Sequence, residues 1–112
     1  MKVYNRQEFL KLPSGTIFCK GAKWFFGTIC IKGHSSELEN DICYLDLCNI
    51  ESDNSDQRVD RLEDSLINGN SYEINNSYGR DTFFDDDDLF LVFEKKDLEF
   101  LSDIIKKLYD CK

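Results

Sequence analysis

Apolar residues along the chain fall into short runs that end in turn-forming residues, a pattern that predicts several β-strands. The runs are rich in aromatic and β-branched side chains, which strands favour. Two neighbouring runs, at residues 24–32 and 42–50, are separated by a short polar loop and predict an antiparallel pair. The run at 89–93 is almost entirely apolar, so we expect an inner strand there. The remaining strand candidates lie at residues 3–4, 16–20 and 71–74.

Helices are predicted from capping residues and from apolar residues that recur every three or four positions. Asn5 has Glu8 three residues after it, the spacing of a capping box, so a first helix begins there and runs to about Leu12. Gly69 follows the second helix, at a position where glycine often ends one. We expect the third helix to pack on the sheet through its apolar stripe. The stripes of the second and third helices are Val59, Leu62 and Leu66, and Leu98, Leu101, Ile105 and Leu108.

These elements predict a single α+β domain over residues 1–112, with an antiparallel sheet of about five strands and two or three helices packed mainly on one face. A chain of 112 residues has the length of one domain, and its 41% hydrophobic residues supply the apolar area for one core. A second independent domain is therefore not expected.

An excess of acidic side chains limits the partners that this chain can take. There are 22 acidic and 14 basic residues, which gives a formal charge of -8. Because affinity for DNA and RNA depends on Lys and Arg that neutralise phosphates, direct nucleic-acid binding is disfavoured. Anionic lipid surfaces are disfavoured for the same reason. A basic protein surface is the natural electrostatic partner.

The sequence predicts a cytoplasmic protein with reduced thiols. Its first residues lack the apolar segment of a secretory leader, and the longest apolar run, at 24–31, is far shorter than a bilayer-spanning helix. The five cysteines are odd in number. Three of them lie in strand-like runs, where a free cysteine behaves as a small apolar residue.

Catalytic, cofactor and metal motifs are not found, so we expect neither an enzyme nor a cofactor. His34 is the single histidine, and nothing in the sequence places a nucleophile and an orienting carboxylate around it. The acidic run at residues 85–88 suggests a metal loop, but it lacks the Gly and Glu spacing of a calcium-binding EF-hand. A solvated loop is the favoured interpretation.

Aromatic residues and one arginine predict a pocket for a nucleotide-like ligand, which needs stacking faces and a planar cation for phosphate. Side-chain alternation places the aromatics of 24–32 and 42–50 on one face, away from Phe25, Ile29 and Ile31. Gly79 allows a tight backbone beside the arginine. The alternative is that these aromatics belong to the core under a helix. The predicted ligand residues are Trp24, Phe26, Tyr44, Asp46, Tyr78 and Arg80.

A second hypothesis explains the acidity as mimicry of nucleic acid. Carboxylates spaced like phosphates occupy the basic groove of a nucleic-acid-dependent protein by electrostatic complementarity. The acidic residues are spread along the whole chain, a distribution that is also typical of an ordinary solvated surface. A scaffold or interaction domain is the third interpretation.

Two segments resemble patterns in small phage and prophage proteins: residues 6–18, RQEFLKLPSGTIF, and the closing Gly79-Arg80-Asp81 with residues 88–94, DLFLVFE. The resemblance implies an accessory protein of a phage that acts in the host cytoplasm against host defence. It assigns no catalytic position.

From the residues and this resemblance together, we expect a non-enzymatic binding protein that sequesters a nucleotide-derived signal. The alternative is an acidic inhibitor of a basic, nucleic-acid-dependent defence enzyme. A homo-oligomer is compatible with the first hypothesis, because signal-binding pockets are often built between subunits.

Overall fold

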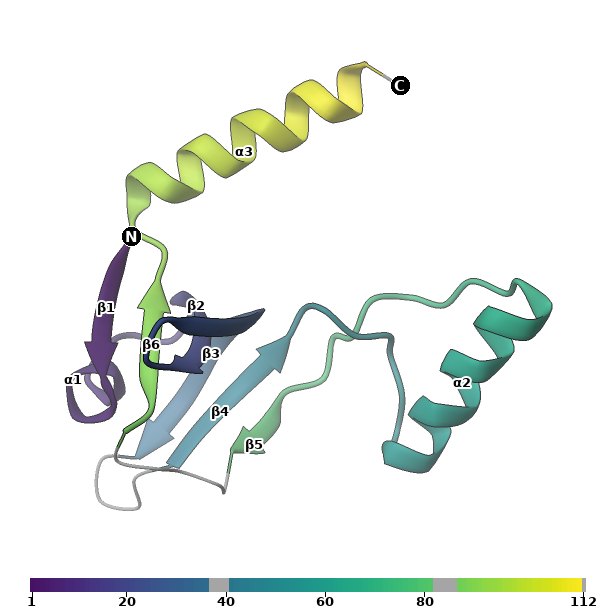
Figure 1. Cartoon of the computed structure of the whole chain (residues 1–112), viewed down its shortest axis with the longest axis horizontal. Coiled ribbons are helices and arrows are strands. Elements are labelled where there is room, and N and C mark those ends of the chain that lie inside the picture. The colour runs from purple at the N-terminus through teal and green to yellow at the C-terminus, as the bar shows by residue number, and fades with distance from the viewer. Residues whose placement is uncertain (37–40, 82–86, 112) are drawn as a thin grey trace.

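Six antiparallel strands form one sheet in the order β1-β6-β2-β3-β4-β5 (Figure 1). The structure is a computed structural model, and it describes residues 1–36, 41–81 and 87–111. The predicted α+β class with an antiparallel sheet is confirmed. The strands are β1 (Lys2–Asn5), β2 (Ile17–Ala22), β3 (Phe25–Ser36), β4 (Asp41–Asp46), β5 (Gly79–Asp81) and β6 (Leu89–Val92).

The described chain contains three helices, and the first two begin after asparagine, a favoured capping residue. The helices are α1 (Arg6–Leu10), α2 (Ser55–Asn68) and α3 (Lys95–Asp110). The Asn5 side chain accepts a 2.9 Å hydrogen bond from the backbone N–H of Glu8, as its spacing predicts. Asn54 caps α2 in the same way, and Gly69 ends that helix with φ +75°.

The strand predictions differ from the structure at the far edge of the sheet. β4 ends at Asp46, whose carboxylate accepts a 2.8 Å hydrogen bond from the backbone N–H of Cys48 and so turns the chain out of the sheet. The expected strand at 71–74 is reduced to an isolated bridge between Ile50 and Ile74. The edge strand β5 is not among the predicted strands, because it contains Gly79, Arg80 and an aspartate and has no apolar pattern.

Three phenylalanines hold α1 against the sheet. The rings of Phe9 and Phe90 stack with centroids 4.0 Å apart and planes 6° apart, and the ring of Phe18 meets Phe9 edge-on at 4.6 Å. All three side chains are at most 2% exposed. Full burial of each contributes roughly 1.5–3 kcal/mol. This cluster is therefore the centre of the core.

Lys32 ties the turn after α1 to the same face of the sheet. Its Nζ donates a 2.8 Å hydrogen bond to the carbonyl of Leu12 and lies 5.8 Å from the centroid of the Phe9 ring. The side chain is buried, and this burial lowers the pKa of the Lys32 ammonium. The backbone of Lys32 also pairs with Gly15 and Thr16, so the turn is fixed by main-chain and side-chain bonds together.

The two long helices do not cover the sheet. Figure 1 shows α3 running above the sheet and α2 standing to its right, both projecting away from it, and neither contains a buried residue. This placement of α3 differs from the expected packing on the sheet. Its start is fixed at the sheet's end, because the N-terminal ammonium contacts Asp97 at 2.7 Å and Glu94 at 3.1 Å. The apolar stripe of α3 is therefore left largely open to solvent.

Asp64 ties α2 to the chain that follows it. Its carboxylate accepts hydrogen bonds from the hydroxyl of Tyr72 at 2.5 Å and from the side-chain amides of Asn68 and Asn70, both at 2.8 Å. These donors, Tyr72 above all, lower the pKa of Asp64 from 3.8 to about 2. The end of α2 is thus held by side-chain bonds rather than by apolar packing.

The tip of the β2–β3 hairpin contains an unusual backbone. Ala22 pairs with Phe25, so Lys23 and Trp24 form a two-residue turn. Trp24 has φ +66° and is the one non-glycine residue with positive φ in the described chain. Glycine is the usual residue at such a turn position, because a Cβ atom there costs roughly 1–2 kcal/mol. The Trp24 side chain is 82% exposed, so contacts within the fold do not offset this cost.

We expect Trp24→Ala to be less stable than Trp24→Gly by roughly 1 kcal/mol. Both changes remove the exposed ring, but only glycine adopts positive φ without steric cost. Urea denaturation of the two variants measures the difference. Equal stability of the variants would show that the turn is not strained.

The Asp64 contacts predict an acid-sensitive attachment of α2. Because the folded pKa of about 2 lies below the ordinary value of 3.8, the stabilisation is complete above pH 4 and is lost as the pH falls from about 4 to 2. Tyr72→Phe removes the strongest donor and should shift the Asp64 pKa back towards 3.8. Carboxyl-detected NMR titration measures this pKa. Tyr109→Phe, an exposed tyrosine on α3, is the control and should leave it unchanged.

Candidate functional site

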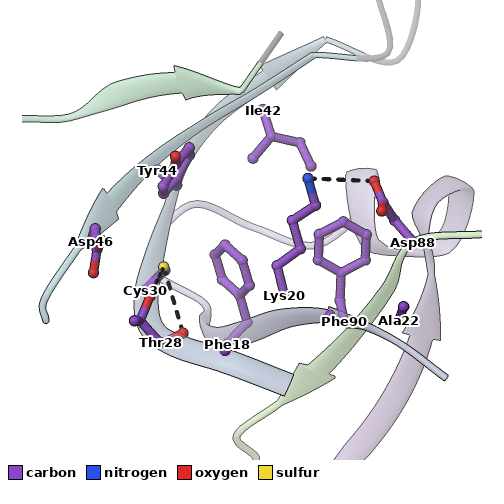
Figure 2. Close-up of a pocket in the computed structure, with 12 residues that line it drawn as sticks. Phe18, Lys20, Ala22, Thr28, Cys30, Ile42, Tyr44, Asp46, Asp88 and Phe90 are labelled. Atoms are coloured by element: carbon purple, nitrogen blue, oxygen red, sulfur yellow. Dashed lines mark hydrogen bonds and ion pairs between the residues drawn. The ribbon is translucent and has the colours of Figure 1, made fainter. Parts of the chain in front are cut away.

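A cavity of about 510 Å³ opens on the face of the sheet that α1 covers only in part. We call it the sheet cavity (Figure 2). Its volume lies within the range of small-molecule sites. It is lined by Phe18, Lys20, Gly21, Ala22, Gly27, Thr28, Cys30, Ile42, Tyr44, Asp46, Asp88 and Phe90.

Strand register brings these side chains together. Residues opposite one another in neighbouring strands point to the same face of a sheet. Lys20 of β2 pairs with Phe90 of β6, and Cys30 of β3 lies opposite both Phe18 and Asp46. Aromatic rings therefore form the floor of the sheet cavity.

The polar groups lie at two ends of this floor. Figure 2 shows Asp46 at one end and the ion pair of Lys20 with Asp88 at the other, with aromatic rings between them. The Lys20 Nζ is 3.4 Å from Asp88, which also accepts a 3.3 Å bond from the buried Arg6. The sheet cavity thus offers a carboxylate at one end and a lysine ammonium at the other.

Cys30 is the thiol in this cavity, and it is held in its neutral form. Burial raises its pKa to about 11, and its Sγ donates to the carbonyl of Thr28 at 3.7 Å. A thiol with so high a pKa is a poor nucleophile at neutral pH. In the sheet cavity Cys30 acts as an apolar wall residue.

Of the predicted ligand residues, Tyr44 and Asp46 line the sheet cavity, but Trp24 and Phe26 do not. Trp24 lies in the hairpin turn rather than in a strand. A bulge in the β2–β3 ladder adds a residue between Ile29 and Phe26, and Phe26 pairs with Gly21 on the opposite face from Lys20. The simple alternation that placed Phe26 beside Tyr44 is broken by this bulge.

Tyr78 and Arg80 also lie away from the sheet cavity. Arg80 pairs with Cys43, the neighbour of Tyr44, and so lies on the other face of the sheet. The ring of Tyr78 lies against Gly33, where an added Cβ would come within 2.9 Å of it. The structure therefore separates the predicted arginine from the predicted stacking residue Tyr44.

The sequence prediction included two of the twelve cavity residues, and the missed ones include the aromatic and charged side chains Phe18, Lys20, Asp88 and Phe90. Phe18 and Lys20 are two positions apart in a predicted strand, and this spacing could have placed their side chains on the same face. Phe90 was assigned to the core, where its ring also lies. Asp88 was interpreted as part of a solvated acidic loop.

Asp88 has a structural role that its neighbours in the sequence do not indicate. Asp85 and Asp86 lie outside the described residues, whereas Asp88 contacts both Arg6 and Lys20. In the described part of the chain, no group of His, Cys, Asp and Glu side chains is arranged to hold a metal ion. No helix in the same residues is long and apolar enough to cross a bilayer.

We expect Asp88→Asn to destabilise the fold by about 1–3 kcal/mol, because it removes the charge that Arg6 contacts at a buried position. Asp60→Asn, on the exposed surface of α2, is the matched control and should change stability by less than about 0.5 kcal/mol. Equilibrium unfolding in urea compares them. Similar small effects in both variants would contradict a structural role for Asp88.

Comparison with known proteins finds no relative of this chain: no family model, no curated protein and no solved structure matches it. The function must therefore be inferred from the residues of the sheet cavity and from the exposed surfaces of the fold.

Proposed function

We propose that this chain is a non-enzymatic binding protein whose sheet cavity holds a small nucleotide-derived ligand. The observation that carries the proposal is the composition of the cavity: aromatic walls with a carboxylate at one end and an ammonium at the other. Binding sites for small molecules combine apolar walls with a few placed polar groups in this way.

The base and the phosphate of a nucleotide each have a counterpart in the sheet cavity. The ring of Tyr44 offers a stacking face for a base. The nearby carboxylate of Asp46 accepts hydrogen bonds from amino or imino groups at the edge of a base. Lys20, on a flexible stem, reaches towards a phosphate at the other end. Arg80 has no part in this arrangement, which replaces the ligand set expected from the sequence.

The role against host defence is a further part of the proposal, and it depends on the resemblance to phage accessory proteins alone. A protein that binds a signal nucleotide without converting it lowers the free concentration of that signal. The raised pKa of Cys30 is compatible with binding without covalent chemistry.

An acidic protein inhibitor is the second candidate, and one observation favours it. α2 stands away from the sheet and exposes Val59, Leu62 and Leu66 beside acidic residues of the same helix. Amphipathic helices of this kind bind in apolar grooves of partner proteins, and the acidic side chains favour a basic rim. The sheet cavity has no role in this alternative.

Thermal-shift measurements with cyclic oligonucleotides and ADP-ribose-derived nucleotides test the proposal. A ligand at 100 times its dissociation constant stabilises the folded state by about 2.7 kcal/mol, which raises the melting temperature by roughly 10 °C for a chain of this size. Thr28→Trp fills the sheet cavity from an exposed position and should abolish the shift.

Arg80→Ala is the control and should keep the full shift, because Arg80 lies on the other face of the sheet. A shift that is lost in Arg80→Ala but kept in Thr28→Trp would place the ligand elsewhere. No shift with any of these nucleotides would contradict the proposal and favour the acidic inhibitor.

A further inference from the structure

The tip of the β2–β3 hairpin exposes two large aromatic rings side by side in the sequence. Trp24 is 82% exposed and Phe25 is 81% exposed, and Lys23 beside them is exposed as well. Trp24 also occupies a turn position that favours glycine. Trp24 thus costs backbone strain and buries little of its side chain within its own fold. A contact with another molecule explains why a tryptophan occupies this position.

The sheet cavity has the chemistry that this tip requires. Its walls are aromatic and aliphatic, which suits the indole of Trp24, and the carboxylate of Asp46 at one end suits the ammonium of Lys23. The hairpin cannot reach its own cavity, because Gly21 and Ala22 at its base form part of the rim and the turn contains only two residues.

We propose that two copies of this chain associate by exchanging hairpin tips, so that Lys23, Trp24 and Phe25 of each copy pack over the mouth of the sheet cavity of the other. Tip and cavity adjoin on one surface, so a two-fold axis can satisfy both contacts at once, as a self-complementary interface requires.

The size of this contact is sufficient for a stable dimer. Aromatic side chains bury roughly 150–250 Å² each, and two tips provide four of them. With the cavity walls that receive them, the interface is on the order of 1,600 Å², the size of a standard specific protein interface. The apolar stripe of α3 is the competing surface for self-association. An open hollow of about 410 Å³ lies along it, but its lining contains Lys106 and no carboxylate that would receive Lys23.

The exchange also deepens the proposed function, and this last step rests on it. In the dimer, Trp24 of a second copy lies at the cavity mouth and supplies the second stacking face that Tyr44 lacks in one chain. A base would then lie between Tyr44 and Trp24 of the second copy. Trp24, which the sequence predicts as a ligand residue, would thus contact the ligand in the sheet cavity of a second copy rather than in that of its own chain.

Sedimentation velocity without ligand tests the exchange. We expect a species of about 26 kDa, twice the 13.1 kDa of one chain, at tens of micromolar protein. Trp24 is the single tryptophan, so its fluorescence should move to shorter wavelength as dilute protein is concentrated and the indole leaves water. Trp24→Gly and the cavity-filling Thr28→Trp should each weaken dimerisation at least 100-fold.

Tyr109→Ser removes a similarly exposed ring from α3 and is the matched control. It should leave the dimer unchanged. A wild-type monomer at these concentrations, or a dimer that survives Trp24→Gly, would overturn the inference.

The two proposals fail in different ways. If the protein dimerises through Trp24 but no nucleotide shifts its melting temperature, the proposed function fails and the exchange stands. If Trp24→Gly is monomeric and still binds nucleotide as tightly as the wild type, the function stands and Trp24 has no part in the ligand site.

Discussion

The fold depends on the packing of Phe9 between Phe18 and Phe90. Two sheet strands and α1 meet at these rings, which are almost completely buried. The open surface of the sheet follows from how small an area this contact covers. α1 has only five residues, whereas the sheet has six strands. A single short helix cannot cover a sheet of that width, so part of the same face stays open as the sheet cavity.

The two ends of the sheet cavity differ in charge, because the ion pairs of Asp88 lie at one end only. Asp88 holds the buried Arg6 next to α1 and at the same time positions Lys20 at the cavity. Asp46 lies at the opposite end, where β4 leaves the sheet. The ion pairs of Asp88 therefore have two effects: they hold Arg6 at the start of α1, and they place the ammonium of Lys20 at the end of the sheet cavity opposite Asp46. A ligand with unlike ends fits such a site in one orientation.

Exposed apolar surface is the second consequence of the small core. α2 and α3 are amphipathic, yet neither has a buried residue, and the hairpin tip presents Trp24 and Phe25 to solvent. Surfaces of this kind are typical of proteins that act in assemblies. Among them, the hairpin tip alone combines apolar area with backbone strain and with a cavity of matching chemistry on the same chain.

The sequence by itself determined the local elements, because caps, turns and apolar periods act over a few residues. The cap at Asn5, the end of α2 at Gly69 and the buried strand β6 all follow from such short-range rules, and so does the α+β class. Only the tertiary structure decided which side chains share a site. One bulge in the β2–β3 ladder moved Phe26 to the other face, because strand side chains alternate with a period of two and an added residue inverts every position beyond it. The pairing of Asp88 with Arg6 joins residues 82 positions apart, a distance at which no local pattern carries information.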